Sequence, residues 1–159
     1  MLFRSDEDIG GEQIRLSSTS YAYKPCYIGK GLDIGEFVSI GSMCHIGRNV
    51  QIGEKTNIQG SNYIADGTQI GSSVFIGPNS TILNDKYPPS GDVSKWKPVR
   101  VEQDAIIGGG CTILPGAHIG SRAVLGGGSV LTKPLPSGQV WAGNPARYLM
   151  TREEYDTRN

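Results

Sequence analysis

The 159-residue sequence lacks the features that mark several classes of protein. It has no apolar run approaching the roughly 18 residues that span a membrane, and its start, MLFRSDEDIGGEQIR, has no apolar stretch of the signal-peptide type. Basic and acidic residues balance at 15 each, so there is neither a basic excess for nucleic acid nor an acidic tail. Only three cysteines are present. These absences predict a cytoplasmic protein, with reduced cysteines, that binds neither nucleic acid nor membranes.

Glycine, by contrast, is abundant at 23 residues, and it accompanies a repeat of six residues. Ten isoleucines follow one another at this spacing from Ile28 to Ile82, and glycine comes directly after seven of them. A second series restarts in its own phase at Val101, Ile107, Ile113, Ile119, Leu125 and Leu131. Glycine suits turns in which the backbone has a positive φ or approaches another segment closely.

A period of six differs from the 3.6-residue period of a helix. It suits short extended pieces joined by turns, since a strand has a period of two. Three hexads make one triangular coil of 18 residues, and successive coils stack at the strand spacing of about 4.8 Å. Each enclosed isoleucine stabilises by roughly 1.5–3 kcal/mol before entropy costs, and only a stack of coils buries a continuous column. The sequence therefore predicts an all-β protein, a parallel three-sided β-helix of hexapeptide repeats.

The repeat stops after Ile82, at NDKYPPSGDVSKWKPVR, which contains three prolines and one glycine. Because proline cannot donate to a strand ladder, this segment has to leave the wall, giving an extruded loop near 84–100. Val101 lies 19 residues after Ile82, which is not a multiple of six, so one extra residue or one coil's length of irregular chain is inserted. A surface loop without a function is one interpretation. Loops on rigid scaffolds often carry function, however, and this one begins with polar side chains.

The length of the coil also predicts which side chains stack. Cys26, Cys44, Asn62 and Ser80 are spaced by one coil each and should form one column. Cys26 and Cys44 would then have Cα atoms about 4.8 Å apart, within disulfide range, but two buried reduced thiols are favoured in a cytoplasmic protein. For Asn62, a backbone group of a turn is favoured over a ligand as the partner.

Three segments are predicted along the chain. Residues 1–20 are polar and irregular, and they form a leader strand or a cap that blocks edge pairing on the first coil. Residues 21–135 form the β-helix with its loop near 84–100. Residues 136–159 form a C-terminal extension, in which PARYLMTREEYDTRN is expected to make a short helix.

The hexads, together with ILPGAHIGSRAVLGGGSVLTKPLP and VWAGNPAR, resemble the left-handed β-helix acyltransferases over nearly the whole chain after about residue 20. Within that superfamily, NDKYPPS resembles the branch that acetylates amino groups of nucleotide-linked deoxysugars such as 3-amino-3,6-dideoxyhexoses. The resemblance implies left-handed coiling, against the usual right-handed crossover rule. It also implies a homotrimer with acetyl-CoA lying in a groove between neighbouring subunits.

The resemblance assigns a set of candidate cofactor-binding residues. Gly109, Gly110 and Gly127 would be coil corners along the groove, where a pantetheine arm approaches backbone groups unhindered by side chains. A backbone N–H there would serve the thioester oxygen as it gains charge. Lys133 and Arg147 are candidates for binding the CoA phosphates. The alternative for both is an ordinary surface charge.

Many relatives in the superfamily carry a histidine base in the corresponding loop, where this sequence has Asn84 and Asp85. His45 and His118 each come five residues after an inward isoleucine, so both should face outward, in turns or on the surface. The absence favours an amine acceptor, because a hydroxyl needs proton removal more than an amine with a pKa near 8 does. Asp85 would orient the amine or take its proton, and Asn84 would hold the sugar or the acyl oxygen. Cys111 should point inward, so direct transfer within a ternary complex is expected rather than an acyl-enzyme.

Three rival functions share this fold. An O-acetyltransferase of a sugar or another small molecule is the nearest alternative, and a non-catalytic β-helix subunit that serves only assembly is the second. A β-helix carbonic anhydrase needs three histidines for zinc. The chain has two histidines, so that function is excluded and no metal site is predicted.

Overall fold

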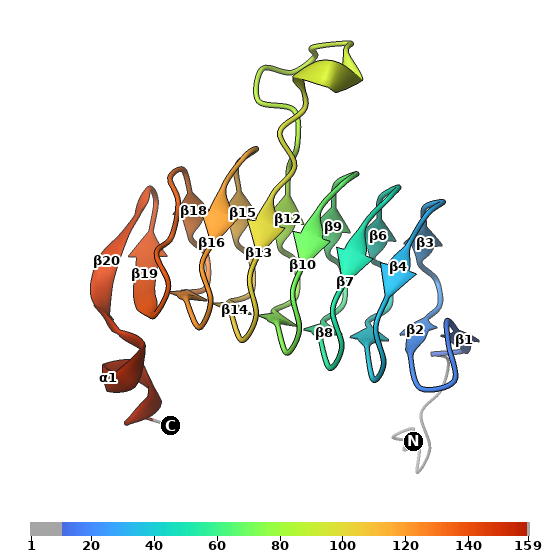
Figure 1. Ribbon diagram of the computed structural model, residues 1–159, viewed down its shortest axis with the longest axis horizontal. Coiled ribbons are helices and arrows are strands. Elements are labelled where there is room, and N and C mark those ends of the chain that lie inside the picture. The colour runs from blue at the N-terminus through green and yellow to red at the C-terminus, as the bar shows by residue number, and fades with distance from the viewer. Residues whose placement is uncertain (1–10, 159) are drawn as a thin grey trace, which may run out of the picture.

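The computed structural model describes residues 11–158, which form a solenoid of short parallel strands (Figure 1). The first half of the predicted N-terminal leader, residues 1–10, lies outside the described residues, as does Asn159. Three strands and three corners make each coil, so the solenoid has three faces, here named A, B and C. The predicted all-β, three-sided β-helix is confirmed.

Each face is a sheet whose strands come from successive coils. Face A contains β2 (Tyr21–Tyr23), β5 (Ser39–Ile40), β8 (Asn57–Ile58), β11 (Phe75–Ile76), β14 (Ile106–Ile107), β17 (Val124–Leu125) and β19 (Gln139–Gly143). Face B contains β3 (Tyr27–Ile28), β6 (His45–Ile46), β9 (Tyr63–Ile64), β12 (Thr81–Ile82), β15 (Thr112–Ile113) and β18 (Val130–Leu131). Face C contains β4 (Asp33–Ile34), β7 (Gln51–Ile52), β10 (Gln69–Ile70), β13 (Arg100–Val101) and β16 (His118–Ile119).

The chain visits the faces in the order B, C, A. Figure 1 shows it passing from face B at the back, over the upper edge to face C at the front, and then along the bottom while it advances from right to left. This sense of rotation is left-handed, as the resemblance implied. Each strand pairs in parallel with the strand one coil away, so that Ile40 lies opposite Ile58 and Ile58 opposite Ile76.

The core is the column of inward isoleucines that the period predicts. Ile40, Ile46, Ile58, Ile64, Ile76 and Ile82 are all 0% exposed. Ile28 and Ile34, in the first coil, are only partly buried against this core. The glycine after the isoleucine lets successive coils approach: a Cβ on Gly77 would lie 2.4 Å from the backbone nitrogen of Gly109 in the next coil. Apolar side chains inside and glycine at the corner therefore produce the coil together.

The loop leaves the solenoid at a single corner between faces B and C. Ile82 ends β12 on face B and Val101 ends β13 on face C, which are successive faces of one coil. Val101 follows Ile82 by 19 residues where six would continue the repeat, so the insertion is longer than one residue and shorter than one whole coil. Both predicted lengths of the insertion are therefore wrong, because the loop returns to the next face of the same coil. The loop holds the short 3-10 helix η1 (Val93–Lys95) and stands away from the solenoid (Figure 1).

Both ends of the described chain depart from the parallel repeat. At the N-terminal end, β1 (Gln13–Arg15) pairs with β2 in antiparallel orientation. At the C-terminal end, β19 continues face A beside β17 and turns back as the antiparallel strand β20 (Ala146–Thr151). The helix α1 (Arg152–Asp156) follows directly, capped by Thr151. The hairpin β19–β20 has no counterpart in the hexapeptide pattern.

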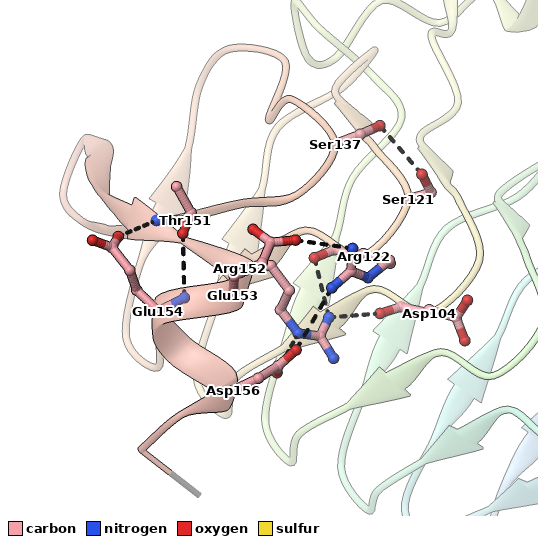
Figure 2. A network of polar contacts seen from close by, with 9 residues as sticks. All are labelled: Asp104, Ser121, Arg122, Ser137, Thr151, Arg152, Glu153, Glu154 and Asp156. Carbon is pink, nitrogen blue, oxygen red and sulfur yellow. Dashed lines mark hydrogen bonds and ion pairs between the residues drawn. The ribbon is translucent and has the colours of Figure 1, made fainter.

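A polar network fixes α1 to the corners between faces C and A (Figure 2). The guanidinium of Arg152 donates to the backbone oxygens of Asp104, at 3.1 Å, and Arg122, at 3.0 Å, which lie in two successive coils. Its Nε donates to the Asp156 carboxylate at 2.7 Å, and the Arg122 side chain donates to Glu153 at 3.1 Å. One arginine thus ties the helix to two coils at once.

The predicted column of Cys26, Cys44, Asn62 and Ser80 is present, and the side chain of Asn62 within it is fully hydrogen-bonded. The side-chain amide of Asn62 donates to the backbone oxygens of Gln59, at 2.7 Å, and Gly77, at 3.0 Å, and its oxygen accepts from the Ser80 N–H at 3.0 Å. The prediction of a backbone partner for Asn62 is therefore confirmed. All three cysteines are free thiols. Cys44 is buried, which raises the pKa of its thiol, but Cys26 in the first coil is only partly buried, so the prediction of a buried thiol is wrong for Cys26.

Candidate active site

The loop stem separates two hollows, and the neighbours Asn84 and Asp85 face different ones. Asn84 lines a cleft of about 330 Å³ on the N-terminal side of the stem, here called the aromatic cleft. Asp85 lines a cleft of about 450 Å³ beside the next coils, here called the proline cleft. Between the two clefts, the two arms of the loop stem are joined by a backbone hydrogen bond, in which the N–H of Lys97 donates to the backbone oxygen of Asn84 at 2.7 Å. The two predicted catalytic residues are therefore adjacent in the chain without sharing one hollow.

Three stacked rings form one wall of the aromatic cleft. Tyr27, His45 and Tyr63 occupy equivalent positions on β3, β6 and β9 of face B, so the coil repeat places them one above another. The His45 ring lies 4.6 Å from that of Tyr27 and 4.8 Å from that of Tyr63, with planes within 17° of parallel. These spacings match the strand spacing of a sheet, so the imidazole is held flat between two phenols. The predicted outward direction of His45 is confirmed.

An ion pair and the loop complete the aromatic cleft. The Arg48 guanidinium contacts the Asp66 carboxylate at 2.7 and 2.8 Å, and the backbone N–H of Arg48 donates to the same carboxylate at 2.8 Å. The Asn84 side chain donates to the backbone oxygen of Asp66 at 3.2 Å, which fixes the start of the loop to the preceding coil. Trp96, from the far arm of the loop, closes the cleft. It also borders an adjoining hollow of about 350 Å³ that shares Arg48 and Asp66.

The proline cleft has a different character. Much of its wall is apolar and comes from the loop and from two successive corners between faces B and C: Leu83, Pro88, Leu114, Pro115 and Pro134. Asp85, Lys86 and Lys133 supply its charges. An apolar channel with two ammonium groups and one carboxylate at its edge suits a long, mostly apolar ligand that carries negative charge.

Both oxygens of the Asp85 carboxylate accept hydrogen bonds from backbone amides of the same loop. One oxygen accepts the Ser90 N–H at 2.9 Å, and the other accepts the Tyr87 N–H at 3.3 Å. The Ser90 amide foremost, with the Tyr87 amide and the charge of Lys95, holds the pKa of Asp85 below its usual range. The carboxylate is therefore ionised near neutral pH and is a weak proton acceptor, and its hydrogen bonds define the turn of the loop.

The predicted cofactor-binding glycines lie on one corner column, between faces A and B. Gly110 has a φ of +69°, and a Cβ on Gly127 would lie 3.3 Å from the backbone oxygen of Gly109. Gly127 also lines a largely apolar groove of about 380 Å³ beneath β20 and α1. The corner therefore carries no side chain at these three positions, and the backbones of successive coils approach one another there.

The two predicted phosphate-binding cations lie elsewhere. Lys133 stands on the corner between faces B and C and lines the proline cleft with Asp85. Arg147 is exposed on β20, where its Nη1 donates to the backbone oxygen of Ala146 at 3.0 Å. Within this chain, face B separates Lys133 from the glycine corner. The single chain therefore brings together Lys133 and Asp85, but not the full predicted cofactor set.

His118 lies on face C, away from the aromatic cleft. Its Nε2 is 2.9 Å from the Glu102 carboxylate, whose other oxygen accepts the Ser121 N–H at 3.0 Å. The hydrogen bond from His118 is the main cause that lowers the pKa of Glu102. The predicted outward direction of His118 is confirmed. Cys111 is 1% exposed with its thiol near the Gly126 oxygen, so its predicted inward direction is confirmed as well.

Several residues of the aromatic cleft were missed by the sequence reasoning although the sequence held a signal for them. Tyr27 and Tyr63 each lie one coil length from His45 along the chain, and Arg48 lies one coil length before Asp66. The stacking of coils brings each of these sets together, as it does for the column of Asn62. Trp96 carried no such signal, since its place depends on the path of the loop.

Comparisons with known proteins agree with the repeat. Residues 98–133 match the family model described as bacterial transferase hexapeptide (six repeats). A galactoside O-acetyltransferase of Lactococcus lactis subsp. lactis (strain IL1403) is 39% identical over 77 residues, which make up 45% of this chain and 37% of that protein. The chain spans about a third to a half of the length of the curated relatives it matches.

Solved structures share the fold more completely. PerB from Caulobacter crescentus, solved in complex with CoA and GDP-perosamine, has a TM-score of 0.73 at 21% identity, over 83% of this chain and 57% of PerB, and this likeness concerns the fold alone. The hexapeptide-repeat acetyltransferase VCA0836 from Vibrio cholerae O1 biovar eltor, complexed with acetyl coenzyme A, has a TM-score of 0.59 at 28% identity, over 79% of this chain and 70% of that one.

The coils, the matched segment and the structural neighbours together define a β-helix protein of the hexapeptide-repeat class. The resemblance predicted from the sequence is confirmed at this level. The relatives and neighbours named above are acetyltransferases. Across residues 11–158, no helix has the length and apolar character needed to cross a membrane, and no three His, Cys, Asp or Glu side chains gather as a metal site.

Proposed function

We propose that the protein transfers the acetyl group of acetyl-CoA directly to the amino group of a nucleotide-linked amino-deoxysugar. In this proposal Asn84 holds the sugar, and Asp85 fixes the loop beside the thioester so that the two substrates meet at the loop stem. The protein acts in the cytoplasm as a homotrimer with active sites between subunits.

The observation that carries the proposal is the pair of unlike clefts that meet at the loop stem. The aromatic cleft offers stacked rings, an amide and an ion pair, which suit a polar ring-containing acceptor. The proline cleft offers apolar walls and the ammonium groups of Lys86 and Lys133, which suit pantetheine and phosphate. In this proposal the thioester end of acetyl-CoA extends past the stem, whose backbone separates the two clefts, and meets the nucleophile beside Asn84 at about 3–3.5 Å.

The split of the predicted cofactor residues supports a site shared between subunits. Gly109, Gly110 and Gly127 line one corner of the solenoid, while Lys133 lines another. A ligand bound by both sets needs a second subunit whose glycine corner faces the loop corner of the first. A homotrimer provides three such junctions by rotation.

The choice of an amine rests on the chemistry of the loop. The Asn84 amide cannot act as a base near neutral pH, and the Asp85 carboxylate accepts hydrogen bonds from the amides of Ser90 and Tyr87. The loop thus supplies no base of its own, and a hydroxyl acceptor depends on a strong base more than an amine does, because an amine is already partly neutral near pH 7.

The test is an acceptor screen in which CoA thiol release from acetyl-CoA is measured with matched amino and hydroxy sugars on the same nucleotide. We expect turnover with amino sugars only. Asn84→Ala should lower kcat/KM about 10- to 100-fold, while Gln51→Ala, on the exposed side of face C, should leave it unchanged. Turnover with hydroxy sugars alone would refute the amine acceptor, and failure to bind acetyl-CoA in calorimetry would refute catalysis in favour of an assembly role.

O-acetyl transfer to a sugar or another small molecule is the second candidate. It is favoured by one observation, the 39% identity to a galactoside O-acetyltransferase over 45% of this chain. The same screen decides between the two acceptors, because the paired sugars differ only in the reacting group.

A further inference from the structure

Amide formation releases a proton, and the loop itself has no good acceptor for it. Asn84 is not a base, and both oxygens of Asp85 accept backbone amides of the loop. Asp85 also lines the proline cleft rather than the aromatic cleft. If the acceptor amine lies in the aromatic cleft beside Asn84, its proton has to reach a group on that side of the stem.

His45 is the imidazole on that side. It lines the aromatic cleft together with Asn84, although the two residues are far apart in the chain. Tyr27 and Tyr63 hold its ring from both faces, so its nitrogens point along the plane of the stack rather than into a neighbouring ring. Among residues 11–158, no hydrogen bond engages either of these nitrogens with a protein group, so both are available to a ligand.

The surroundings of His45 suit proton transfer. The titratable and charged groups that line the cleft with it are the phenols of Tyr27 and Tyr63 and the ion pair of Arg48 with Asp66. The ion pair is closed at 2.7 Å, so its two charges largely offset one another at the imidazole. An imidazole accepts a proton at one ring nitrogen and can pass it on, which is what the role of a general base requires.

His118 provides a natural contrast. It lies on face C, and its Nε2 is already 2.9 Å from the Glu102 carboxylate. His118 is not among the residues that line the aromatic cleft, where Asn84 lies. His45 therefore lies beside the loop stem, whereas His118 does not.

We propose that His45 is the proton acceptor of the transfer reaction, an assignment that rests on the proposed function of the site. The amine nitrogen attacks the carbonyl carbon of acetyl-CoA, the C–N bond forms and the C–S bond breaks. The proton lost by the nitrogen moves to a ring nitrogen of His45. It then passes to the departing thiolate, so that the products are the acetamide and CoA thiol and His45 returns to its neutral form.

The first test uses His45→Phe, which keeps an aromatic ring between Tyr27 and Tyr63 and removes both nitrogens. We expect kcat to fall about 100-fold or more with KM changed less than threefold, because a general base contributes to the transition state rather than to binding. The acid limb that an imidazole base gives to the pH profile should disappear. His118→Phe is the matched control and should match the wild type in kcat, KM and pH profile.

The second test reads binding without turnover. With two histidines in the chain, ¹³C labelling of histidine gives two imidazole signals, which His118→Phe assigns. Titration with GDP-, UDP- and dTDP-linked amino sugars should shift the His45 signal and leave that of His118 in place. In His45→Ala, added imidazole should restore part of the lost rate, as expected for a missing base and not for a missing structural ring.

The outcomes separate this inference from the proposed function. Acetylation of amino sugars with full activity in His45→Phe would overturn the role of His45 and leave the function standing. Acetylation of hydroxy sugars alone, still lost in His45→Phe, would overturn the amine acceptor and uphold His45 as the base. If no sugar nucleotide shifts the His45 signal and none is acetylated, both are overturned.

Discussion

Replacing Gly77 by alanine would place a methyl group against the next coil of the solenoid. The added Cβ would lie 2.4 Å from the Gly109 nitrogen and 2.8 Å from the Gly108 carbonyl carbon. Gly77 does not have a positive φ, so alanine fits its own backbone and the whole effect comes from the contact between coils. To relieve it, the two coils must separate by about 1 Å at this corner.

The separation would weaken the hydrogen bonds that join these coils. The Gly77 N–H donates to the Ile107 oxygen at 2.7 Å, and the Gly110 N–H donates to the Pro78 oxygen at 2.8 Å. Both would be stretched beyond the normal range of about 3.2 Å. Two such bonds, at about 0.5–1.5 kcal/mol each, and the strain of an overfilled contact lower the free energy of unfolding by about 3 kcal/mol.

Urea unfolding followed by circular dichroism, at one fixed protein concentration, measures this change. The control is Gly128→Ala, because Gly128 has a φ of +71° but nothing within 4 Å of an added Cβ. It isolates the cost of the left-handed backbone, about 1 kcal/mol. If Gly77→Ala costs no more than Gly128→Ala, close approach of the coils is not the reason for glycine after isoleucine.

Three further changes test other contacts. Arg152→Ala removes the donors to two corner oxygens and should lower the free energy of unfolding by about 2 kcal/mol, with Arg152→Lys restoring little of it in the same urea assay. Asp85→Ala should speed tryptic cleavage at the loop lysines several-fold. Backbone amides lower the pKa of Asp85 in the folded loop. The Asp85 carboxylate therefore stabilises the loop fully above the ordinary carboxyl pKa near 4, and this stabilisation is lost as the pH falls through the lower pKa of the folded state. Hydrogen exchange of the loop should show this transition in the wild type and not in Asp85→Asn. Burial raises the pKa of all three thiols, but Cys26 is partly exposed whereas Cys44 and Cys111 are buried, so only Cys26 should react at an appreciable rate with a disulfide reagent in the native state. Fast labelling of Cys44 or Cys111 would contradict their buried positions.

The solenoid was predictable because one short rule repeats along it. An isoleucine at every sixth position fixes the inward side, and the glycine after it fixes the corner, so a single correct period orients residues from Ile28 to Leu131. The same period explains the Asn62 hydrogen bonds and the Tyr27–His45–Tyr63 stack, both of which depend on the length of the coil. Because the isoleucine recurs ten times, the three repeats in which glycine does not follow it do not obscure the pattern.

The loop and the C-terminal hairpin have no repeat, and there the sequence indicated less. Prolines predicted that the chain leaves the wall, but the directions of Asn84 and Asp85 depend on single contacts with Asp66 and Ser90 that no pattern announces. Because Asn84 and Asp85 are adjacent in the sequence, we expected them to act at one site, whereas their side chains face different clefts. The antiparallel return of β20 follows a turn, and its register shifts at Val140.

The inserted segment between β12 and β13 leaves no trace in the pairing of either strand. Each keeps its register with the strands one coil away, as if the insertion were absent. The sequence of the solenoid and the sequence of the inserted segment can therefore change independently of each other. The segment between these strands can be lengthened, shortened or replaced, in evolution or by design, without a change in the strand pairing of the coils that keep the chain folded.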